Sequence, residues 1–394
     1  MMQPKKTFNV VMVLESAFPS VGGGGAENQV ATLCQNLPVD VEAEIVVPRV
    51  DYAPQAIRDE FKGTPIRRIA YPAIPLVGGI ILLMKLAWML LVDARKIDMI
   101  HCHIAGNMAA ISALIGRITG KQVLVKLTGW HELELGILSP INSVRNRFNR
   151  WAIKKATYIQ TTSQLMEHSL REFGFSNDQI RYLPNAVDTD RFQPKPESKQ
   201  AIRSQLGIEQ KRTGIFMGRL VEEKNLHRLI KCWTSVVKPT GKCQLLLVGE
   251  GHLRDEHQSL INELGCQDDI ILVGATKQVD LYFQASDFAI LPSTFEGLSN
   301  ALLEAMASGL PMLGSRVSGT ADMVDHELNG WLFEPTDEQA LDDCLSTIIN
   351  KSDQELQNLG QQARKKIMAF AGKDAVISKL LDLYQYPGQL EKEY

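Results

Sequence analysis

Short apolar segments rich in β-branched residues alternate with longer segments of helical periodicity along most of this chain. In the first half the short segments lie at residues 8–13, 44–47, 99–102, 123–126 and 158–161. The alternation then starts again, at residues 213–217, 244–248, 270–273, 288–291 and 311–313. This pattern is typical of parallel sheets joined by crossover helices, such as residues 226–237 and 278–285 here. The sequence therefore predicts an α/β fold with two parallel-sheet domains in series.

A polar, proline-containing segment, P-K-P-E-S-K-Q at residues 194–200, lies between the two series and has the composition of a domain connection. We therefore expect an N-terminal domain over residues 1–195 and a C-terminal domain over residues 196–371. Hydrophobic residues then recur at helical spacing before a Pro-Gly pair, at Val376, Ile377, Leu380, Leu381 and Tyr384. They predict a last helix that could pack on either domain.

Composition and charge exclude several classes of protein. The 394 residues include 42 basic and 45 acidic side chains, a net charge of -3, which gives no general reason to expect nucleic-acid binding. The six cysteines show no CxxC spacing, as expected in a reducing, cytoplasmic setting. The N-terminal sequence has neither the apolar core nor the cleavage site of a signal peptide. The most apolar stretch, residues 80–92, contains Lys85 and is shorter than a membrane span, so we expect a buried or interfacial helix.

Residues 295–311, F-E-G-L-S-N-A-L-L-E-A-M-A-S-G-L-P, contain two carboxylates eight positions apart. The Gly-Leu-Pro end predicts a helix over residues 298–308, because glycine adopts the left-handed conformation that ends a helix and proline cannot continue one. Side chains lean toward the start of a helix, so we expect the Glu304 carboxylate to point back toward the first amides, those of Gly297, Leu298 and Ser299. Such amides bind phosphate, and flanking carboxylates such as Glu296 accept hydrogen bonds from hydroxyls. A nucleotide sugar has both phosphate groups and sugar hydroxyls.

A second candidate site for phosphate is the segment G-R-L-V-E-E-K, which directly follows the strand at residues 213–217. Ligands of open α/β sheets bind beyond the carboxyl ends of the strands, where Arg219 and Lys224 lie. We place Lys224 at the start of the next helix, where the helix dipole disfavours a cation unless an anion shares the site. The alternative is an ordinary solvated loop in which Glu222 and Glu223 neutralise the lysine.

Four glycines at residues 22–25 lie between the first strand and the first helix, and their amides can approach a charged group closely. Gly24 and Gly25 are therefore candidates for phosphate or substrate binding. The dinucleotide fingerprint G-x-G-x-x-G fails because Glu27 occupies the place of the third glycine, which argues against a nicotinamide enzyme. The alternative is a flexible surface loop.

Two patterns resemble metal sites. His101 and His103 lie on one face of a predicted strand, but no third ligand stands at a useful spacing, so we favour a polar role at the strand end. Asp188-Thr189-Asp190 resembles the D-x-D of metal-dependent sugar transferases. It follows Pro184-Asn185-Ala186, however, so turn chemistry explains both aspartates. We expect no metal ligand in this chain.

Basic and aromatic residues alternate in a segment that is predicted to be helical and contains Arg145, Arg147, Phe148, Arg150, Trp151, Lys154 and Lys155. Such a segment can lie on an anionic bilayer. The alternative, which we favour, has the aromatic rings in the core and the cations in water. With residues 80–92, the segment keeps peripheral membrane contact open.

Taken together, five motifs resemble the retaining glycosyltransferases of family 4 in order and spacing: the glycine loop, P-N-A-V-D-T-D-R-F (184–192), G-R-L-V-E-E-K (218–224), V-G-E-G (248–251) and E-G-L-S-N-A-L-L-E (296–304). The resemblance covers nearly the whole chain. It implies the GT-B fold, two Rossmann-like domains facing across a cleft, with the last helix (372–394) crossing back to the N-terminal domain. It also implies a hexosyltransferase that retains anomeric configuration and uses neither a metal nor a tightly bound cofactor.

The resemblance further implies a role for each candidate residue. Arg219 and Lys224 would neutralise the donor diphosphate, and Glu296 would touch the donor sugar. Glu304 would hold the ribose, while the amides of Gly297, Leu298 and Ser299 would bind the phosphate. Residues of the base region and of the acceptor region follow from the same resemblance: Gly249 and Val273 for the base, and Gly24, Gly25, His103 and the segment 130–132, which contains His131, for the acceptor. Many relatives carry a histidine directly after the strand at 123–128, where this chain has Thr128-Gly129-Trp130-His131.

Other functions remain open at this point. A phosphorylase-like or pyridoxal-dependent enzyme, a nucleotide-sugar epimerase and an inactive nucleotide-binding protein can share this architecture. For the transferase, the donor can be a UDP or a GDP sugar, of which we favour UDP. We expect a glycan or lipid-linked glycan as acceptor, in surface polysaccharide synthesis, and a cytoplasmic location at the inner face of the membrane.

Overall fold

The computed structural model describes residues 7–19, 24–50, 55–141 and 143–385. The chain divides into two compact units, Met1–Ala186 with Val376–Tyr394 and Val187–Ala375. The sequence placed the first boundary in the polar segment at residues 194–200. The division lies before that segment, because Val187 pairs with Gly372 in an isolated parallel bridge that ties residues 187–193 to the second unit.

The first unit contains one sheet with the strand order β3-β4-β2-β1-β5-β6-β7-β8. All of its neighbouring strands are parallel except β3 and β4. The strands are β1 (Phe8–Val13), β2 (Val41–Pro48), β3 (Arg58–Phe61), β4 (Thr64–Ile69), β5 (Met99–Cys102), β6 (Gln122–Lys126), β7 (Tyr158–Thr161) and β8 (Ile180–Tyr182). The order reverses at β1, so the loops after β1 and β5 diverge there.

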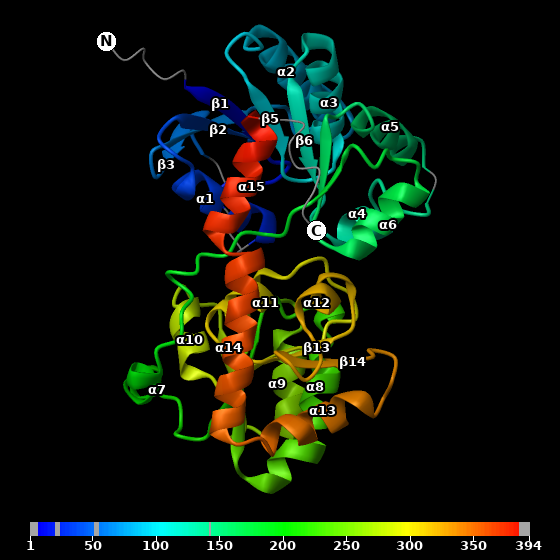
Figure 1. The fold of residues 1–394 in the computed structure, drawn as a ribbon. Coiled ribbons are helices and arrows are strands. Elements are labelled where there is room, and N and C mark those ends of the chain that lie inside the picture. Colours follow the sequence, from blue (N-terminus) through cyan, green and yellow to red (C-terminus); the bar gives the residue numbers. More distant parts are fainter. Residues whose placement is uncertain (1–6, 20–23, 51–54, 142, 386–394) are drawn as a thin grey trace, which may run out of the picture. The chain divides into compact units, whose positions relative to one another are not determined.

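Helices cover both faces of this sheet, because alternate strand residues face opposite sides. The helices of the first unit are α1 (Gly25–Asn36), α2 (Val77–Val92), α3 (Asn107–Thr119), α4 (Trp130–Glu134), α5 (Val144–Ile153) and α6 (Gln164–Glu172). Val11 and Val13 face the core formed with α2, α3 and α5. Val10 and Met12 face the core formed with α1 and with α15 (Lys373–Gln385), which Figure 1 shows in red. The last helix thus packs on the first unit through Ile377, Leu380 and Tyr384, among others.

The second unit contains one parallel sheet with the strand order β11-β10-β9-β12-β13-β14. Its strands are β9 (Arg212–Met217), β10 (Cys243–Val248), β11 (Ile270–Gly274), β12 (Phe288–Leu291), β13 (Met312–Ser315) and β14 (Gly330–Phe333). Its helices are α7 (Lys199–Leu206), α8 (Leu226–Cys232), α9 (Arg254–Glu263), α10 (Val279–Ala285), α11 (Asn300–Ala307), α12 (Ser318–Met323), α13 (Ala340–Ile349) and α14 (Asp353–Phe370). The strand order reverses at β9, between β10 and β12.

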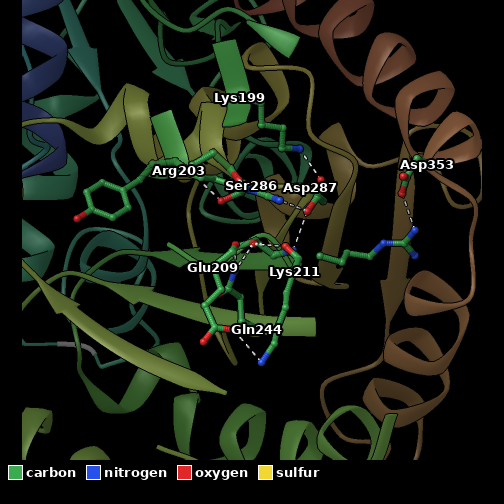
Figure 2. Close-up of polar contacts among 12 residues, drawn as sticks. Lys199, Arg203, Glu209, Lys211, Gln244, Ser286, Asp287 and Asp353 are labelled. Atoms are coloured by element: carbon green, nitrogen blue, oxygen red, sulfur yellow. Dashed lines mark hydrogen bonds and ion pairs between the residues drawn. The ribbon is translucent and has the colours of Figure 1, made fainter. Parts of the chain in front are cut away.

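Polar contacts at the amino ends of β9 and β12 fix α7 to this sheet (Figure 2). Asp287, one residue before β12, accepts hydrogen bonds from the Lys199 ammonium and, at 2.7 Å, from Nη2 of Arg203. The same carboxylate accepts a hydrogen bond of 2.7 Å from the Thr213 amide in β9. This network stabilises the amino ends of the strands. It does not involve the loops at their carboxyl ends, where ligands of such sheets bind.

Candidate active site

The loops after β9, β10 and β11 are joined backbone to backbone. The Gly249 amide donates to the Gly274 carbonyl at 2.9 Å, and the Gly218 amide donates to the Val248 carbonyl at 3.0 Å. Gly249 has a φ of 141°, and a Cβ at this position would overlap the carbonyl oxygen of Gly218. A Cβ at Gly251 would likewise overlap the carbonyl oxygen of Leu220. The V-G-E-G motif therefore has a packing reason for its glycines, because only residues without a side chain let these loops touch.

The loops after β9 and β12 meet at the point where the strand order reverses. The Thr294 amide donates to the Glu223 carbonyl at 2.9 Å. The Lys224 ammonium donates a hydrogen bond to Oε2 of Glu296, and the Ser293 hydroxyl donates to the same oxygen at 3.2 Å. Two residues that the sequence selected separately thus form an ion pair at the switch point, the usual ligand position in open α/β sheets.

Lys224 and Arg219 differ in their surroundings. Lys224 is buried, with 9% of its surface exposed, whereas the Arg219 side chain is 68% exposed and contacts Glu223 at 3.1 Å. Glu222 contacts His252 at 2.9 Å. The interpretation in which Glu222 and Glu223 neutralise Lys224 is therefore wrong. Lys224 also ends a short 3₁₀ turn, Glu222–Lys224, and precedes α8 by two residues, so it does not start the helix as the sequence suggested.

The start of α11 borders this ion pair. The helix runs from Asn300, two residues later than expected, and Ser299 is its N-terminal cap residue. Within the described residues, the amides of Gly297 and Ser299 find no hydrogen-bond acceptor. The Gly297 carbonyl accepts a hydrogen bond of 2.9 Å from Gly319, whose missing side chain allows the close approach. Gly309, with a φ of 78°, follows the helix end as predicted. The helix start therefore retains the donors that an anion requires.

Glu304 lies one turn inside α11 and is partly buried. No described residue donates a hydrogen bond to its carboxylate, so it does not contact the helix-start amides. Burial raises the pKa of Glu304 from 4.5 to about 8; Arg191 partly opposes this and Asp280 adds to it. A protonated carboxyl without a partner among the described residues can donate a hydrogen bond to a ligand oxygen or accept one from a ligand hydroxyl.

The candidate residues of the first unit lie in the loops after β1, β5 and β6. Gly24 caps α1 and Gly25 begins it, one residue earlier than expected, while Gly22 and Gly23 lie outside the described residues. A side chain at Gly24 would overlap the carboxylate of Glu27. The backbone of His131 lies in α4, and its side chain lies outside the described part.

His103 is fully buried, so its ring cannot touch an acceptor in this conformation. It stacks on His101 with ring centroids 3.9 Å apart, and within the described residues neither ring nitrogen has a hydrogen-bond partner. Nδ1 of His101 and the Tyr384 hydroxyl of α15 share a hydrogen bond of 2.7 Å. Burial lowers the pKa of His101 to about 3 and that of His103 well below its usual value. The pair therefore forms a neutral contact beneath the last helix.

Two buried polar residues also lie in this region, and the sequence analysis missed one of them, Lys126. Lys126 ends β6 beside Gln160 of β7 and is 3% exposed; burial lowers its pKa from 10.5 to about 7. Glu132 is buried and accepts hydrogen bonds from the Gly129 amide at 2.9 Å and from the Thr128 hydroxyl at 2.8 Å. Glu132 therefore shapes the loop after β6. A lysine closing an apolar strand was the available signal for Lys126.

The D-x-D pattern is structural, as predicted. The Asp188 carboxylate accepts hydrogen bonds from the amides of Asp190 and Arg191 at 3.2 and 3.4 Å, which is turn chemistry. It also contacts the Lys373 ammonium at 3.0 Å. In the part of the chain that the structure describes, no three His, Cys, Asp or Glu side chains converge as a metal site would require.

A lysine–carboxylate pair next to helix-start amides that have no acceptor among the described residues, at the switch point of a parallel sheet, is typical of α/β proteins that bind phosphorylated ligands. Two family models match the chain: Glycosyltransferase Family 4 over residues 23–191 and Glycosyl transferases group 1 over residues 198–366. The chain belongs to the glycosyltransferases of family 4 and has the GT-B fold.

Individual relatives agree with this family. N-acetyl-alpha-D-glucosaminyl L-malate synthase of Bacillus anthracis is 25% identical over 74% of this chain and 75% of its own length. UDP-Gal:alpha-D-GlcNAc-diphosphoundecaprenol alpha-1,3-galactosyltransferase of Escherichia coli is 24% identical over 86% of each chain. Anabaena HepE, solved in complex with UDP, is 19% identical over 95% of this chain and 99% of its own, with a TM-score of 0.79. This chain is thus a glycosyltransferase of the hexosyltransferase type.

Proposed function

We propose that this protein is a metal-independent, retaining hexosyltransferase that uses a UDP sugar. The Lys224–Glu296 ion pair at the switch point of the second sheet carries the proposal. In the donor complex, the Lys224 ammonium and the Arg219 guanidinium bind the diphosphate, and the amides of Gly297 and Ser299 bind the phosphate nearer the helix. Fixed cations and amides stabilise the charge that grows on the leaving diphosphate, without reorganisation and without a metal.

The carboxylates act on the two sugars of the donor. Glu296, released from Lys224 by the diphosphate, accepts hydrogen bonds from the hydroxyls of the transferred hexose. Glu304 accepts a hydrogen bond from the ribose, and residues near Gly249 and Val273 border the base. The acceptor hydroxyl attacks the face that the diphosphate leaves, which retains the configuration. The complex of HepE with UDP and the UDP-Gal donor of the Escherichia coli relative support UDP over GDP.

We assign the acceptor to the class of glycans or lipid-linked glycans in surface polysaccharide synthesis. The diphosphoundecaprenol acceptor of the Escherichia coli relative supports this class. Acceptor contacts are expected from the first unit, at Gly24, Gly25 and the segment around His131. The proposal places the reaction on the cytoplasmic side of the membrane, where nucleotide sugars are made.

A thermal-shift panel tests the donor. A matching ligand at 100 times its dissociation constant adds about 2.7 kcal/mol to the free energy of unfolding, so the matching UDP sugar is expected to raise the melting temperature, with and without EDTA. Stabilisation by GDP-mannose alone would overturn the UDP assignment, and dependence on a divalent cation would overturn the metal-free mechanism. NMR of the product anomeric centre tests retention.

The same samples separate the rival functions. A nucleotide-sugar epimerase would isomerise the donor without any acceptor, whereas a transferase leaves the donor intact or hydrolyses it slowly. An inactive nucleotide-binding protein would bind the donor without turnover of either kind. A pyridoxal enzyme would show the absorbance of a bound Schiff base.

A further inference from the structure

Helix α2 is apolar on two opposite faces. Leu82, Leu86 and Leu90 are buried against the sheet of the first unit. The opposite face is exposed and carries a row of large hydrophobic side chains: Leu76, Val77, Ile80, Met84, Trp88, Leu91 and Val92. Met84 and Trp88 are 66% and 70% exposed. A helix on the surface of a water-soluble protein normally carries polar residues on its outer face, so an apolar row of this length indicates a binding face.

The exposed face of α5 combines aromatic and basic residues. Phe148 and Trp151 are exposed and lie 5.9 Å apart between ring centroids. The Lys155 ammonium lies 5.7 Å from the Trp151 ring. Arg145 and Arg147 are exposed on the same helix, which contains no acidic residue. The aromatic rings are therefore not in the core, contrary to the alternative that the sequence favoured.

The two helices belong to one layer of the first unit. Both pack on α3, and all three cover the same face of the sheet (Figure 1). Residues 77–157, which include this layer, contain eleven Lys and Arg against four Asp and Glu, a formal charge of +7. The other residues contain 31 Lys and Arg against 41 Asp and Glu, a formal charge of -10. The apolar row thus lies in a basic part of an otherwise acidic chain.

We propose that the exposed faces of α2 and α5 bind the surface of an anionic lipid bilayer. Apolar side chains enter the headgroup boundary, aromatic rings lie at the interface and the cations meet anionic headgroups, which is the recognised chemistry of interfacial helices. A second copy of this basic layer would bring like charges together, which disfavours self-association through it. Within the described residues, no helix is long and apolar enough to cross a membrane.

This inference goes beyond the proposed transfer reaction, since membrane binding requires neither donor nor acceptor. Sedimentation of the full chain with vesicles of phosphatidylcholine, with or without phosphatidylglycerol, measures it directly. The wild type is expected to bind only the vesicles with phosphatidylglycerol. Met84→Ser combined with Trp88→Ser is expected to weaken binding about tenfold or more. Met368→Ser, on the exposed side of α14 in the second unit, is the matched control and should bind as the wild type does.

A second variant tests the charges. Arg145→Gln combined with Arg147→Gln removes two exposed cations and is expected to weaken binding about thirtyfold, since each cation near an anionic surface adds about a factor of five. Arg58→Gln, on the exposed strand β3, is the control. Equal binding to neutral vesicles, or no loss in either double variant, would overturn the proposal. So would a dimer in analytical ultracentrifugation that Met84→Ser with Trp88→Ser dissociates, because the row would then be a protein interface.

Discussion

Lys224 and Glu296 are 72 residues apart in the sequence, yet their side chains form an ion pair between the loops that follow β9 and β12. Both side chains are largely buried, at 11% and 15% exposed. The carboxylate thus holds the ammonium where the donor diphosphate is proposed to bind. A ligand that takes over the ammonium frees the carboxylate for the sugar, so donor binding exchanges one ion pair for two new contacts.

Lys224→Met is expected to reduce kcat about a hundredfold or more, because it removes a fixed cation that stabilises the leaving diphosphate. KM for the donor is expected to change less, since the amides of α11 and Arg219 remain. Steady-state kinetics with the donor found by thermal shift measure both constants.

Lys366→Met is the matched control for Lys224→Met, since Lys366, on α14, also contacts a carboxylate, that of Asp325 at 2.8 Å, which is not among the residues proposed to bind the donor. Its kinetics should equal those of the wild type. If both variants lost the same activity, the effect would be one of stability rather than of charge at the leaving group.

Glu304→Gln is expected to remove a pH dependence of stability. Because the pKa of Glu304 is raised from 4.5 to about 8, the folded state binds more protons than the unfolded state between these values. The contribution of Glu304 to the free energy of unfolding therefore falls as pH rises through that range. Urea titrations across this pH range should show a smaller decline in the free energy of unfolding for Glu304→Gln than for the wild type. Glu263→Gln, on the exposed side of α9, should follow the wild type.

The strands that position the site could be predicted because each is a short apolar run next to a helical pattern. Strand β4 could not, since its sequence T-P-I-R-R-I has a proline and two arginines. Arg68 is nevertheless buried there, because its guanidinium donates to the Phe18 carbonyl, 50 residues away, and to the Asp59 carboxylate at 2.9 Å. The partners that allow Arg68 to be buried come from other segments of the chain, so the local sequence does not predict its burial.

The candidate site was predictable to a similar extent. Glycine, lysine and glutamate at strand ends and helix starts could be selected, because backbone chemistry gives them a reason to be there. Their pairing could not be predicted. The sequence suggested Glu223 as a partner of Lys224, but Glu223 contacts Arg219 and Lys224 pairs with Glu296. Burial was equally hard to predict. A histidine at a strand end is expected to be accessible, but α15, at the far end of the sequence, covers His101 and His103.

Gly249→Ala separates packing from ligand contact at the V-G-E-G motif. The alanine methyl group would overlap the Gly218 carbonyl, so the loops after β9 and β10 would have to part, and we expect a loss of about 3 kcal/mol or more in stability. Gly241→Ala is the control, because Gly241 also has a positive φ, 62°, but has open space around it. It should cost only about 1 kcal/mol. Chemical denaturation of both variants measures the difference, and equal losses would argue against close loop packing.

Lys126→Met is expected to stabilise the first unit most at and below neutral pH. The pKa of Lys126 falls from 10.5 to about 7 on folding, so the folded state binds fewer protons between these values and its stability rises with pH there. Below the lower value a buried ammonium without a partner among the described residues opposes folding, and methionine removes that cost while filling the same volume. The gain over the wild type should therefore shrink as pH rises toward the upper value, as denaturant titrations can measure. Lys231→Met, exposed on α8, should show no such trend, and a uniform gain at every pH would mean that packing rather than charge explains the effect.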